Sequence, residues 1–398
     1  MLRSGVILLV ALTALRSATI CFADEARPVR DATAEKAWLE HGRTPADRDR
    51  IRAIMAEGVD RKLVPGGSVL ILHKGEVVLR EGFGVADLDS KRPFTIDAPC
   101  RIASVTKPFT STLMAMLVEE GLLSWDDPVD KFLPEFKGIT VRDRGAAKRA
   151  PLIRELLSHT AGFPGNQVTK AGRWPIRREG PLGEIVKGIA AKGLVAEPGQ
   201  AYAYTGLGYM SAGRVAEVVT GQEFSALMTK RLLEPIGADE AGFLPSDQVR
   251  SLVPTPYDRA GGTLKAINIA ERMESAMNVP NPGGGLVATL DDVSRLALLH
   301  LRRGKVGDKQ IVAEASLRAL YKPQFGSRPD GYALGFNTQK IGPDGYARRV
   351  RHVGASGPIL EIDFEHDLAI IVFTQVPQSA QLRDRVIQET YRVFGADD

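Results

Sequence analysis

The sequence predicts a mixed fold of the α/β (α+β) class, in which an antiparallel sheet is flanked by terminal helices and carries an inserted all-helical lobe. Strand-like patterns occur near both ends of the chain, and helical segments cut by Pro and Gly fill the region between them. Of the 398 residues, 44% are hydrophobic and 25% are charged, which is typical of a globular protein. This length suffices for one large domain or for two lobes that share a core.

The first 23 residues have the features of an export signal. Arg3 supplies a positive charge, residues 6–15 are largely apolar, and Cys21 to Ala23 resemble a small-x-small cleavage site. An apolar run of about 10 residues is shorter than the roughly 20 that span a bilayer. We therefore expect a signal peptide over 1–23, a periplasmic or secreted mature protein and no stable membrane span. Lipid attachment at Cys21 is an open alternative.

The charge content argues against nucleic-acid binding, and the cysteine content excludes an internal disulfide in the mature chain. The chain has 52 Lys and Arg against 48 Asp and Glu, a formal net charge of +4, and basic and aromatic residues are not interleaved. It lacks the electrostatic footprint of a nucleic-acid-binding protein, so no nucleic acid partner is expected. Cleavage leaves Cys100 alone, which excludes an internal disulfide, and its apolar neighbours predict a buried small side chain.

The segment before the insertion predicts a helix, a hairpin and a second helix. Residues 46–62 place apolar side chains on one helix face. Residues 67–72 and 77–85 have strand composition and are joined by a short turn, which predicts an antiparallel hairpin. Residues 104–121 form a strongly apolar helical pattern that ends at a glycine.

The middle of the chain predicts helices, and the end predicts strands again. No strand pair is evident from about 126 to 285, where the helical segments are 153–158, 182–192, 209–220 and 223–233. Four strands and an amphipathic helix follow, at 332–338, 347–353, 359–364, 368–374 and 381–394. We therefore assign 24–125 and 284–398 to a sheet lobe and 126–283 to a helical lobe, with the active site between the two lobes.

Ser104 and Lys107 form an S-x-x-K pattern at the start of a predicted helix. Residues three apart share a helix face, so the Lys107 amine is expected beside the Ser104 hydroxyl. Pro108 is tolerated only in a first helical turn, which places Ser104 at the helix N-terminus. Free N–H groups there favour an oxyanion, and an apolar environment would lower the Lys107 pKa so that it could take the serine proton. The pattern alone is weak, because a capping serine followed by an exposed lysine has the same spacing.

Further motifs stand in an ordered series along the chain. They are L-L-S-H-T-A-G at 156–162, P-G at 198–199 with Tyr204 behind it, G-G-G-L at 283–286, Y-A-L-G-F at 332–336 and H-V-G at 352–354. Together with S-x-x-K, this series resembles the serine β-lactamase and penicillin-binding protein superfamily, in its class C and esterase-like branch, from about 51 to 394. The resemblance implies a β-lactamase/transpeptidase-like fold and a serine hydrolase.

The resemblance also implies the proton-handling roles. Ser104 would be the nucleophile that forms an acyl-enzyme, and Lys107 would accept its proton. Tyr204 would shuttle a proton to the leaving group, with Lys107 nearby favouring the phenolate.

Three substrate-binding positions are implied near the last motif. His352 takes the first position of the K-T-G-like strand, where its pKa would be tunable near neutral pH. Gly354 takes the last position, where the absence of a side chain would let substrate lie against the strand edge. The backbone N–H of Ala355, with that of Ser104, would form the oxyanion hole.

Two other charged or titratable residues have structural interpretations. We expect His159 to belong to a structural turn near the site, and Arg348 to be an exposed edge charge, with binding of a substrate carboxylate as its alternative. The remaining histidines have no metal-site spacing. Neither a metal nor a cofactor is therefore expected.

Gly206 departs from the family pattern, because the middle motif reads Y-T-G where the resemblance implies Y-x-N. The missing amide would bridge the substrate carbonyl and Lys107, and we expect its loss to cost on the order of 1 to 3 kcal/mol. The loss affects amide substrates more than esters. We therefore predict an esterase-like serine hydrolase acting on small-molecule esters or small amides, with two alternatives: a D-amino-acid peptidase or weak β-lactamase, and a non-catalytic envelope binding or scaffold protein.

Overall fold

A computed structural model describes residues 32–170, 172, 180–267, 279–325 and 331–395 of the chain. Its centre is a six-stranded sheet in the order β11-β12-β13-β14-β1-β2, with every neighbouring pair antiparallel. The strands are β1 (Gly66–His73), β2 (Glu76–Gly84), β11 (Asn337–Ile341), β12 (Ala347–Val353), β13 (Ile359–Asp363) and β14 (Leu368–Thr374). The predicted α+β class is confirmed.

The sheet joins the two ends of the chain. β1 pairs with β14 in a continuous register that sets Val69 opposite Val372 and Leu70 opposite Ile371. Every residue of β1 is buried, which is why this strand is an apolar run instead of an alternating one. The N-terminal hairpin therefore depends on the C-terminal strands for its pairing.

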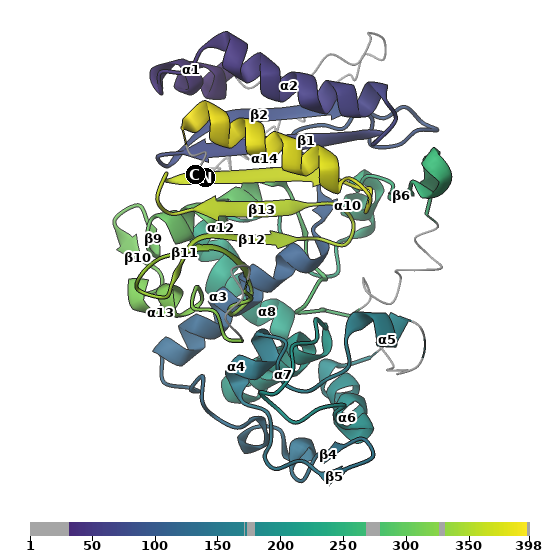
Figure 1. Ribbon diagram of the computed structural model, residues 1–398, viewed down its shortest axis with the longest axis vertical. Coiled ribbons are helices and arrows are strands. Elements are labelled where there is room, and N and C mark those ends of the chain that lie inside the picture. Colours follow the sequence, from purple (N-terminus) through teal and green to yellow (C-terminus); the bar gives the residue numbers. More distant parts are fainter. Residues whose placement is uncertain (1–31, 171, 173–179, 268–278, 326–330, 396–398) are drawn as a thin grey trace, which may run out of the picture.

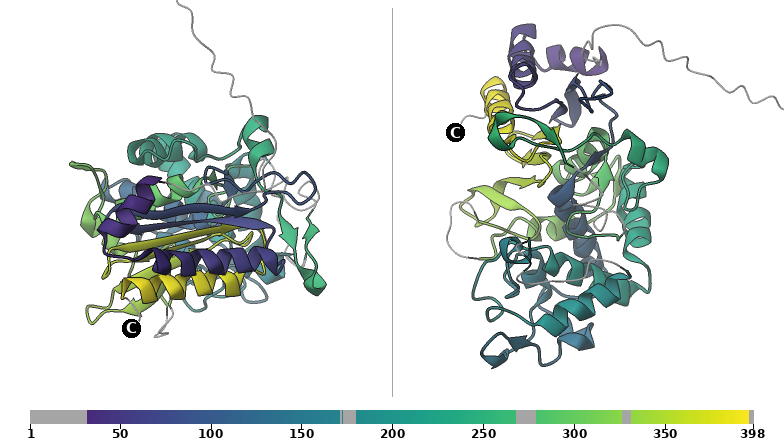
Figure 2. Two further views of the ribbon diagram at one scale, coloured as in Figure 1. Left: turned by 90° about the horizontal axis from the view of Figure 1, so that it is seen from above. Right: turned by 90° about the vertical axis from the view of Figure 1, so that its right-hand side faces the viewer.

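Helices cover both faces of the sheet (Figures 1 and 2). On one face, α2 (Pro45–Asp60) and α14 (Ala380–Phe394) lie side by side, and α1 (Ala32–Glu40) lies beside β2. On the other face lie α12 (Leu290–Leu301) and α3 (Thr106–Glu119). Alternate β1 residues divide between two apolar cores, as the two-residue strand period requires: Leu70 and Leu72 contribute to the core of α3 and α12, whereas Val69 and Ile71 contribute to that of α2 and α14.

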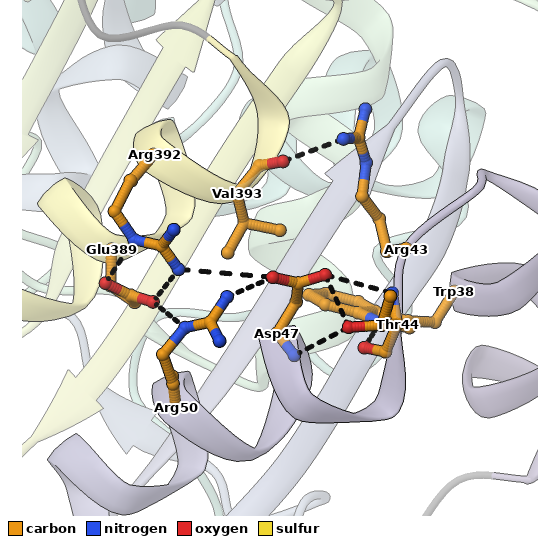
Figure 3. A network of polar contacts seen from close by, with 8 residues as sticks. All are labelled: Trp38, Arg43, Thr44, Asp47, Arg50, Glu389, Arg392 and Val393. Carbon is orange, nitrogen blue, oxygen red and sulfur yellow. Dashed lines mark hydrogen bonds and ion pairs between the residues drawn. The ribbon is translucent and has the colours of Figure 1, made fainter.

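A polar network connects α2 with α14 (Figure 3). Thr44 begins α2 with a reciprocal capping box to Asp47, and Arg50 joins Asp47 to Glu389 of α14. Arg43 donates to the Val393 carbonyl at 2.8 Å. These contacts fix the two terminal helices against each other.

The inserted region consists of short helices, of which α4 to α8 lie below the sheet in Figure 1 and α10 lies at the height of the sheet. They are α4 (Ile153–Leu157), α5 (Asn166–Lys170), α6 (Leu182–Lys192), α7 (Leu207–Thr220), α8 (Phe224–Met228), the π-helix η4 (Thr229–Leu233), α9 (Glu234–Ile236) and α10 (Asp247–Leu252). The region also contains two strand pairs that were not predicted, because each strand has only two residues: β4 (Thr140–Val141) with β5 (Gly145–Ala146), and β6 (Tyr257–Asp258) with β7 (Lys265–Ala266).

The remaining elements are short. Two pairs of short strands are β3 (Cys100–Arg101) with β8 (Val287–Ala288) and β9 (Lys305–Val306) with β10 (Lys309–Gln310). The others are the 3-10 turns η1 (Ala103–Val105), η2 (Val129–Lys131), η3 (Pro134–Phe136) and η5 (Ala260–Gly262), and the helix α13 (Glu314–Ala319).

Two element predictions were wrong. The polar stretch before residue 46 contains α1, which was not predicted. The predicted strand 332–338 is mostly a turn, because Gly335 has φ of +95° and Ala333 donates back to the Phe336 carbonyl; β11 begins only at Asn337. The other C-terminal strands and the last helix agree with the prediction to within one residue.

Within the described ranges, no helix combines the length and apolarity needed to cross a bilayer. The predicted signal peptide, 1–23, lies outside the described residues and stays a prediction.

Candidate active site

Ser104 lies in η1, the 3-10 turn that leads directly into α3. The turn follows β3, whose pairing with β8 fixes the chain just before it. Ala103 adopts φ of +46°, a left-handed conformation uncommon outside glycine, and Ser104 remains partly exposed. The predicted nucleophile therefore lies in the turn before α3 and not in the helix itself, whose first residue is Thr106. Its partial exposure lets substrate reach it.

Lys107 lies in the first turn of α3 and is completely buried. Its Nζ donates to the Ser104 hydroxyl oxygen at 3.1 Å and to the Gly283 carbonyl at 2.6 Å. Burial disfavours the charged ammonium and lowers the Lys107 pKa to about 7. An amine that is substantially neutral near pH 7 can accept a proton from the hydroxyl it contacts.

Tyr204 lies against the same amine. Lys107 Nζ is 4.9 Å from the centroid of the Tyr204 ring, and the Asn166 N–H donates to the Tyr204 carbonyl at 2.8 Å. Burial raises the pKa of the phenol to about 12, although its hydrogen-bond partner, the Ser104 hydroxyl, opposes this rise. The expectation of a Tyr204 phenolate is therefore wrong: the phenol keeps its proton at neutral pH, because burial outweighs its polar contacts.

His352 lies near the end of β12 and is buried. Its Nε2 lies 3.0 Å from the Tyr332 hydroxyl, and its Nδ1 lies 3.2 Å from the Val353 carbonyl. A neutral ring with the proton on Nδ1 satisfies both contacts. Burial, followed by the charge of Lys107, holds the His352 pKa well below its usual value. The expectation of titration near neutral pH is therefore wrong.

The chain after β12 is attached to the residues that precede Ser104. Ser356 donates its hydroxyl proton to the Arg101 carbonyl at 2.8 Å. A Cβ on Gly354 would lie 2.5 Å from the Ile102 carbonyl oxygen, so this close approach of two backbones requires glycine there. The structure thus gives Gly354 a packing reason, and the predicted contact of substrate with the strand edge stays a prediction.

Ala355 is exposed next to this junction. Among the described residues, neither its N–H nor that of Ser104 donates to a protein acceptor. Two N–H groups without a protein acceptor fit the predicted oxyanion hole, which stays a prediction.

Gly206 immediately precedes α7, and its N–H donates to the Asn166 side-chain oxygen at 3.2 Å. A Cβ on Gly206 would meet no atom within 4 Å, so nothing in the packing requires glycine. The Cβ position at residue 206 is therefore open. Gly283 supplies the acceptor for Lys107 instead.

Aromatic side chains surround the Lys107 amine, and sequence reasoning gave most of them no role. The His159 ring centroid lies 4.3 Å from that of Tyr204 and 4.6 Å from that of Tyr332. Tyr209 places its ring centroid 5.1 Å from Lys107 Nζ. His159 does lie in a turn, with φ of +62°, as predicted. Tyr332 and Gly283 belonged to recognised motifs, which was the available signal for both.

Two other residues considered in the sequence, Arg348 and Cys100, have structural contacts outside the group around Ser104. Arg348 is half-buried in β12, between β11 and β13, and pairs with Asp344 at 3.0 Å, so the prediction of an exposed edge charge is wrong, and binding of a substrate carboxylate stays a prediction. Cys100 is buried, and burial raises the pKa of its thiol, as expected of a structural side chain. In the described part of the chain, no group of three or more His, Cys, Asp or Glu is arranged to hold a metal ion.

Comparison with known proteins assigns the family. The family model described as Beta-lactamase matches residues 51–392. Esterase EstB of Burkholderia gladioli is 27% identical over 77% of this chain and 83% of its own length. Penicillin-binding protein 4 of Amycolatopsis lactamdurans is 31% identical over 68% of each chain.

Among solved structures, the hydrolase EstCE1, described as having promiscuous acyltransferase activity, superposes with a TM-score of 0.75 at 23% identity, over 86% of this chain and 100% of its own. This likeness shows that the fold is shared. With the family match over nearly the whole described region, it confirms the resemblance identified from the motifs. The chain therefore belongs to the β-lactamase family, as an esterase-like serine hydrolase.

Proposed function

We propose that this chain hydrolyses small carboxylic esters through an acyl-serine intermediate on Ser104. The observation that carries the proposal is the contact between Lys107 Nζ and the Ser104 hydroxyl, at 3.1 Å, together with the burial that lowers the Lys107 pKa to about 7. A base and a nucleophile in contact are the minimum machinery for covalent catalysis. The similarity to an esterase supports the choice of substrate.

In the acylation step, the Ser104 oxygen attacks the ester carbonyl carbon while its proton moves to Lys107 Nζ. The negative charge on the former carbonyl oxygen is stabilised by the N–H groups of Ser104 and Ala355. Collapse of this intermediate breaks the bond to the alcohol oxygen. That oxygen takes the proton of the Tyr204 phenol, and the Lys107 ammonium then restores the phenol.

In the deacylation step, water attacks the Ser104 ester and gives its proton to the neutral Lys107 amine. The Ser104 oxygen leaves and takes this proton back from the Lys107 ammonium, which regenerates the free enzyme. The balance is one ester and one water converted to one acid and one alcohol. No group beyond those of the chain and the solvent is required.

Esters are favoured over amides because of Gly206. An amide leaving group is poor and its N–H requires a partner, yet residue 206 offers no side chain and the space around it is open. Hydrolysis of β-lactams and D-amino-acid peptides is therefore proposed to be slow. The retained contact of Lys107 with Ser104 favours a hydrolase over the non-catalytic scaffold alternative.

The test is covalent labelling together with turnover. A fluorophosphonate and p-nitrophenyl butyrate are given to the protein, and intact mass and released p-nitrophenol are measured. We expect one adduct per chain, mapped to Ser104, and ester turnover. Ser104→Ala should abolish both, whereas Ser251→Ala, at an exposed helix serine, should change neither. No adduct and no turnover in the wild-type chain would contradict the proposal.

We also propose that the mature chain begins after Ala23 and acts outside the cytoplasm. The support is the signal-like composition of the first 23 residues. Intact mass of the protein secreted from an expressing bacterium should show cleavage there. Retention of the full chain inside the cell would contradict it.

A further inference from the structure

The Lys107 amine depends on a tight turn formed by residues 281–285. The Asn281 side-chain oxygen accepts the Gly283 N–H at 2.9 Å, and the Asn281 carbonyl accepts the N–H groups of Gly284 and Gly285. A Cβ on Gly285 would lie 2.9 Å from the Asn281 nitrogen, so the turn is closed as tightly as glycine allows. Such side-chain-to-backbone bonds are how Asn fixes turns.

Two residues of α3 hold this turn from the other side. The Thr110 hydroxyl donates to the Pro282 carbonyl at 2.6 Å, and the Lys107 amine donates to the next carbonyl, that of Gly283, at 2.6 Å. Lys107 and Thr110 are three residues apart and share a helix face. One face of α3 therefore binds two consecutive carbonyls of the turn.

The Gly283 carbonyl can orient the lone pair of Lys107. A neutral amine has two N–H bonds and one lone pair, and it accepts the Ser104 proton only when the lone pair faces the hydroxyl oxygen. The amine rotates about its Cε–Nζ bond, so an N–H held by the Gly283 carbonyl leaves the lone pair only two directions. The aromatic rings of Tyr204 and Tyr209, about 5 Å from Nζ, limit where the second N–H can lie.

We propose that Asn281 is a positioning residue for ester hydrolysis, which fixes the Gly283 carbonyl against Lys107 so that the amine faces Ser104. This inference rests on the proposed function of Ser104 and Lys107. It also explains how the site retains an acceptor for Lys107 although Gly206 lacks the family side chain. Asn281 acts through the backbone of Gly283 and is assigned no contact with substrate.

Of the titratable side chains described around this site, Lys107 is the one whose pKa is shifted to about 7. His159 and His352 are held neutral by burial, and burial keeps the phenols of Tyr204 and Tyr209 protonated, since it raises their pKa. The fall of the hydrolysis rate toward low pH, the acid limb of the pH profile, consequently reports the protonation of the Lys107 amine. A carbonyl acceptor favours the charged amine, so losing it should move this limb to lower pH.

The experiment compares three substitutions at Asn281 by their pH profiles for p-nitrophenyl ester hydrolysis. Asn281→Ala removes the acceptor for the Gly283 N–H; we expect kcat to fall by about tenfold with KM little changed, and the acid limb to move down by about half a pH unit. Asn281→Asp keeps an acceptor and adds a negative charge, so the limb should move up by about half to one unit. Asn281→Ser, with a shorter acceptor, should recover most of kcat.

A purely structural role would not move the acid limb of the pH profile in opposite directions in Asn281→Ala and Asn281→Asp. Ser246→Ala is the matched control, because the Ser246 hydroxyl also accepts a backbone N–H, that of Val249, at the start of α10. Its profile should equal that of the wild type. Unchanged limbs in all Asn281 variants, or the same shift in Ala and Asp, would overturn the inference. Ser104 labelling of the wild-type chain separates this failure from a failure of the proposed function, because labelling does not depend on the variants.

Discussion

The Tyr332 hydroxyl lies 3.0 Å from Nε2 of His352, and both side chains are buried. The position that carries a lysine in the K-T-G strand is therefore occupied here by a neutral ring with a neutral partner. Among the residues that the structure describes, no acidic side chain pairs with position 352, so a permanent positive charge there would lack a counterion, and Lys107 lies close enough to oppose it.

We predict that His352→Lys will not create β-lactamase activity. The new ammonium would be buried beside Lys107 without an acidic partner, so it would lose its proton or destabilise the fold by on the order of 3 kcal/mol. Thermal unfolding and nitrocefin hydrolysis measure the two effects. A stable variant with new β-lactam turnover would show that this position is better solvated than the structure indicates.

Tyr204→Phe should discriminate among leaving groups. The phenol, whose pKa is raised to about 12, is a proton donor, and only poor leaving groups need that proton. We expect kcat for an ethyl or butyl ester to fall by about 10² or more, and kcat for a p-nitrophenyl ester to fall much less. Equal losses for both classes of ester would instead indicate that Tyr204 acts as a base in the attack.

Gly206→Asn should restore amide-directed activity. The position has open space for a side chain, so the substitution should leave thermal stability nearly unchanged. A new amide beside the substrate carbonyl should raise the turnover of a penicillin or a D-alanyl peptide by roughly tenfold, the effect of one hydrogen bond, with ester turnover changed less. Gly221→Asn, at the glycine that ends α7, is a control outside the site. No gain with any amide would mean that the missing side chain does not limit these substrates.

Lys107→Met should be inactive yet more stable than the wild type. The buried lysine has a pKa of about 7 in the folded chain and 10.5 when unfolded, so below pH 7 its burial costs on the order of a few kcal/mol. Between these values the unfolded chain binds more protons, and wild-type stability rises with pH. The advantage of the variant should therefore shrink from about pH 7 to 10.5 in denaturant titrations. An advantage that does not change with pH would mean that Lys107 is charged in the fold.

The sequence predicted the elements whose patterns are local. β1 and β14 are apolar runs, and α14 has a regular apolar face, so their positions could be read without knowledge of their partners. The segment around Gly335 was misassigned because its composition suits a strand, whereas its conformation is set by α3: a Cβ there would lie 2.3 Å from the Ser111 hydroxyl oxygen. Such a constraint comes from a distant part of the chain.

The chemical state of the site residues could be predicted only in part. The adjacency of Ser104 and Lys107 follows from their spacing in sequence, and the structure brings them together. The protonation of Tyr204 and His352 was predicted wrongly, because it depends on how completely other segments bury them. The G-G-G-L motif marked Gly283, but its role as an acceptor for Lys107 was not predicted, because a backbone carbonyl is common to every residue type.

The most direct measurement is the pH dependence of the rate at which a fluorophosphonate labels Ser104. If Lys107 is the base, the rate constant should rise through one ionisation near pH 7, the pKa of its buried amine, and Lys107→Met should show a low rate without that inflection. A rate that does not change between about pH 5 and 9, or an inflection that persists in Lys107→Met, would contradict the assignment of Lys107 as the proton acceptor of Ser104.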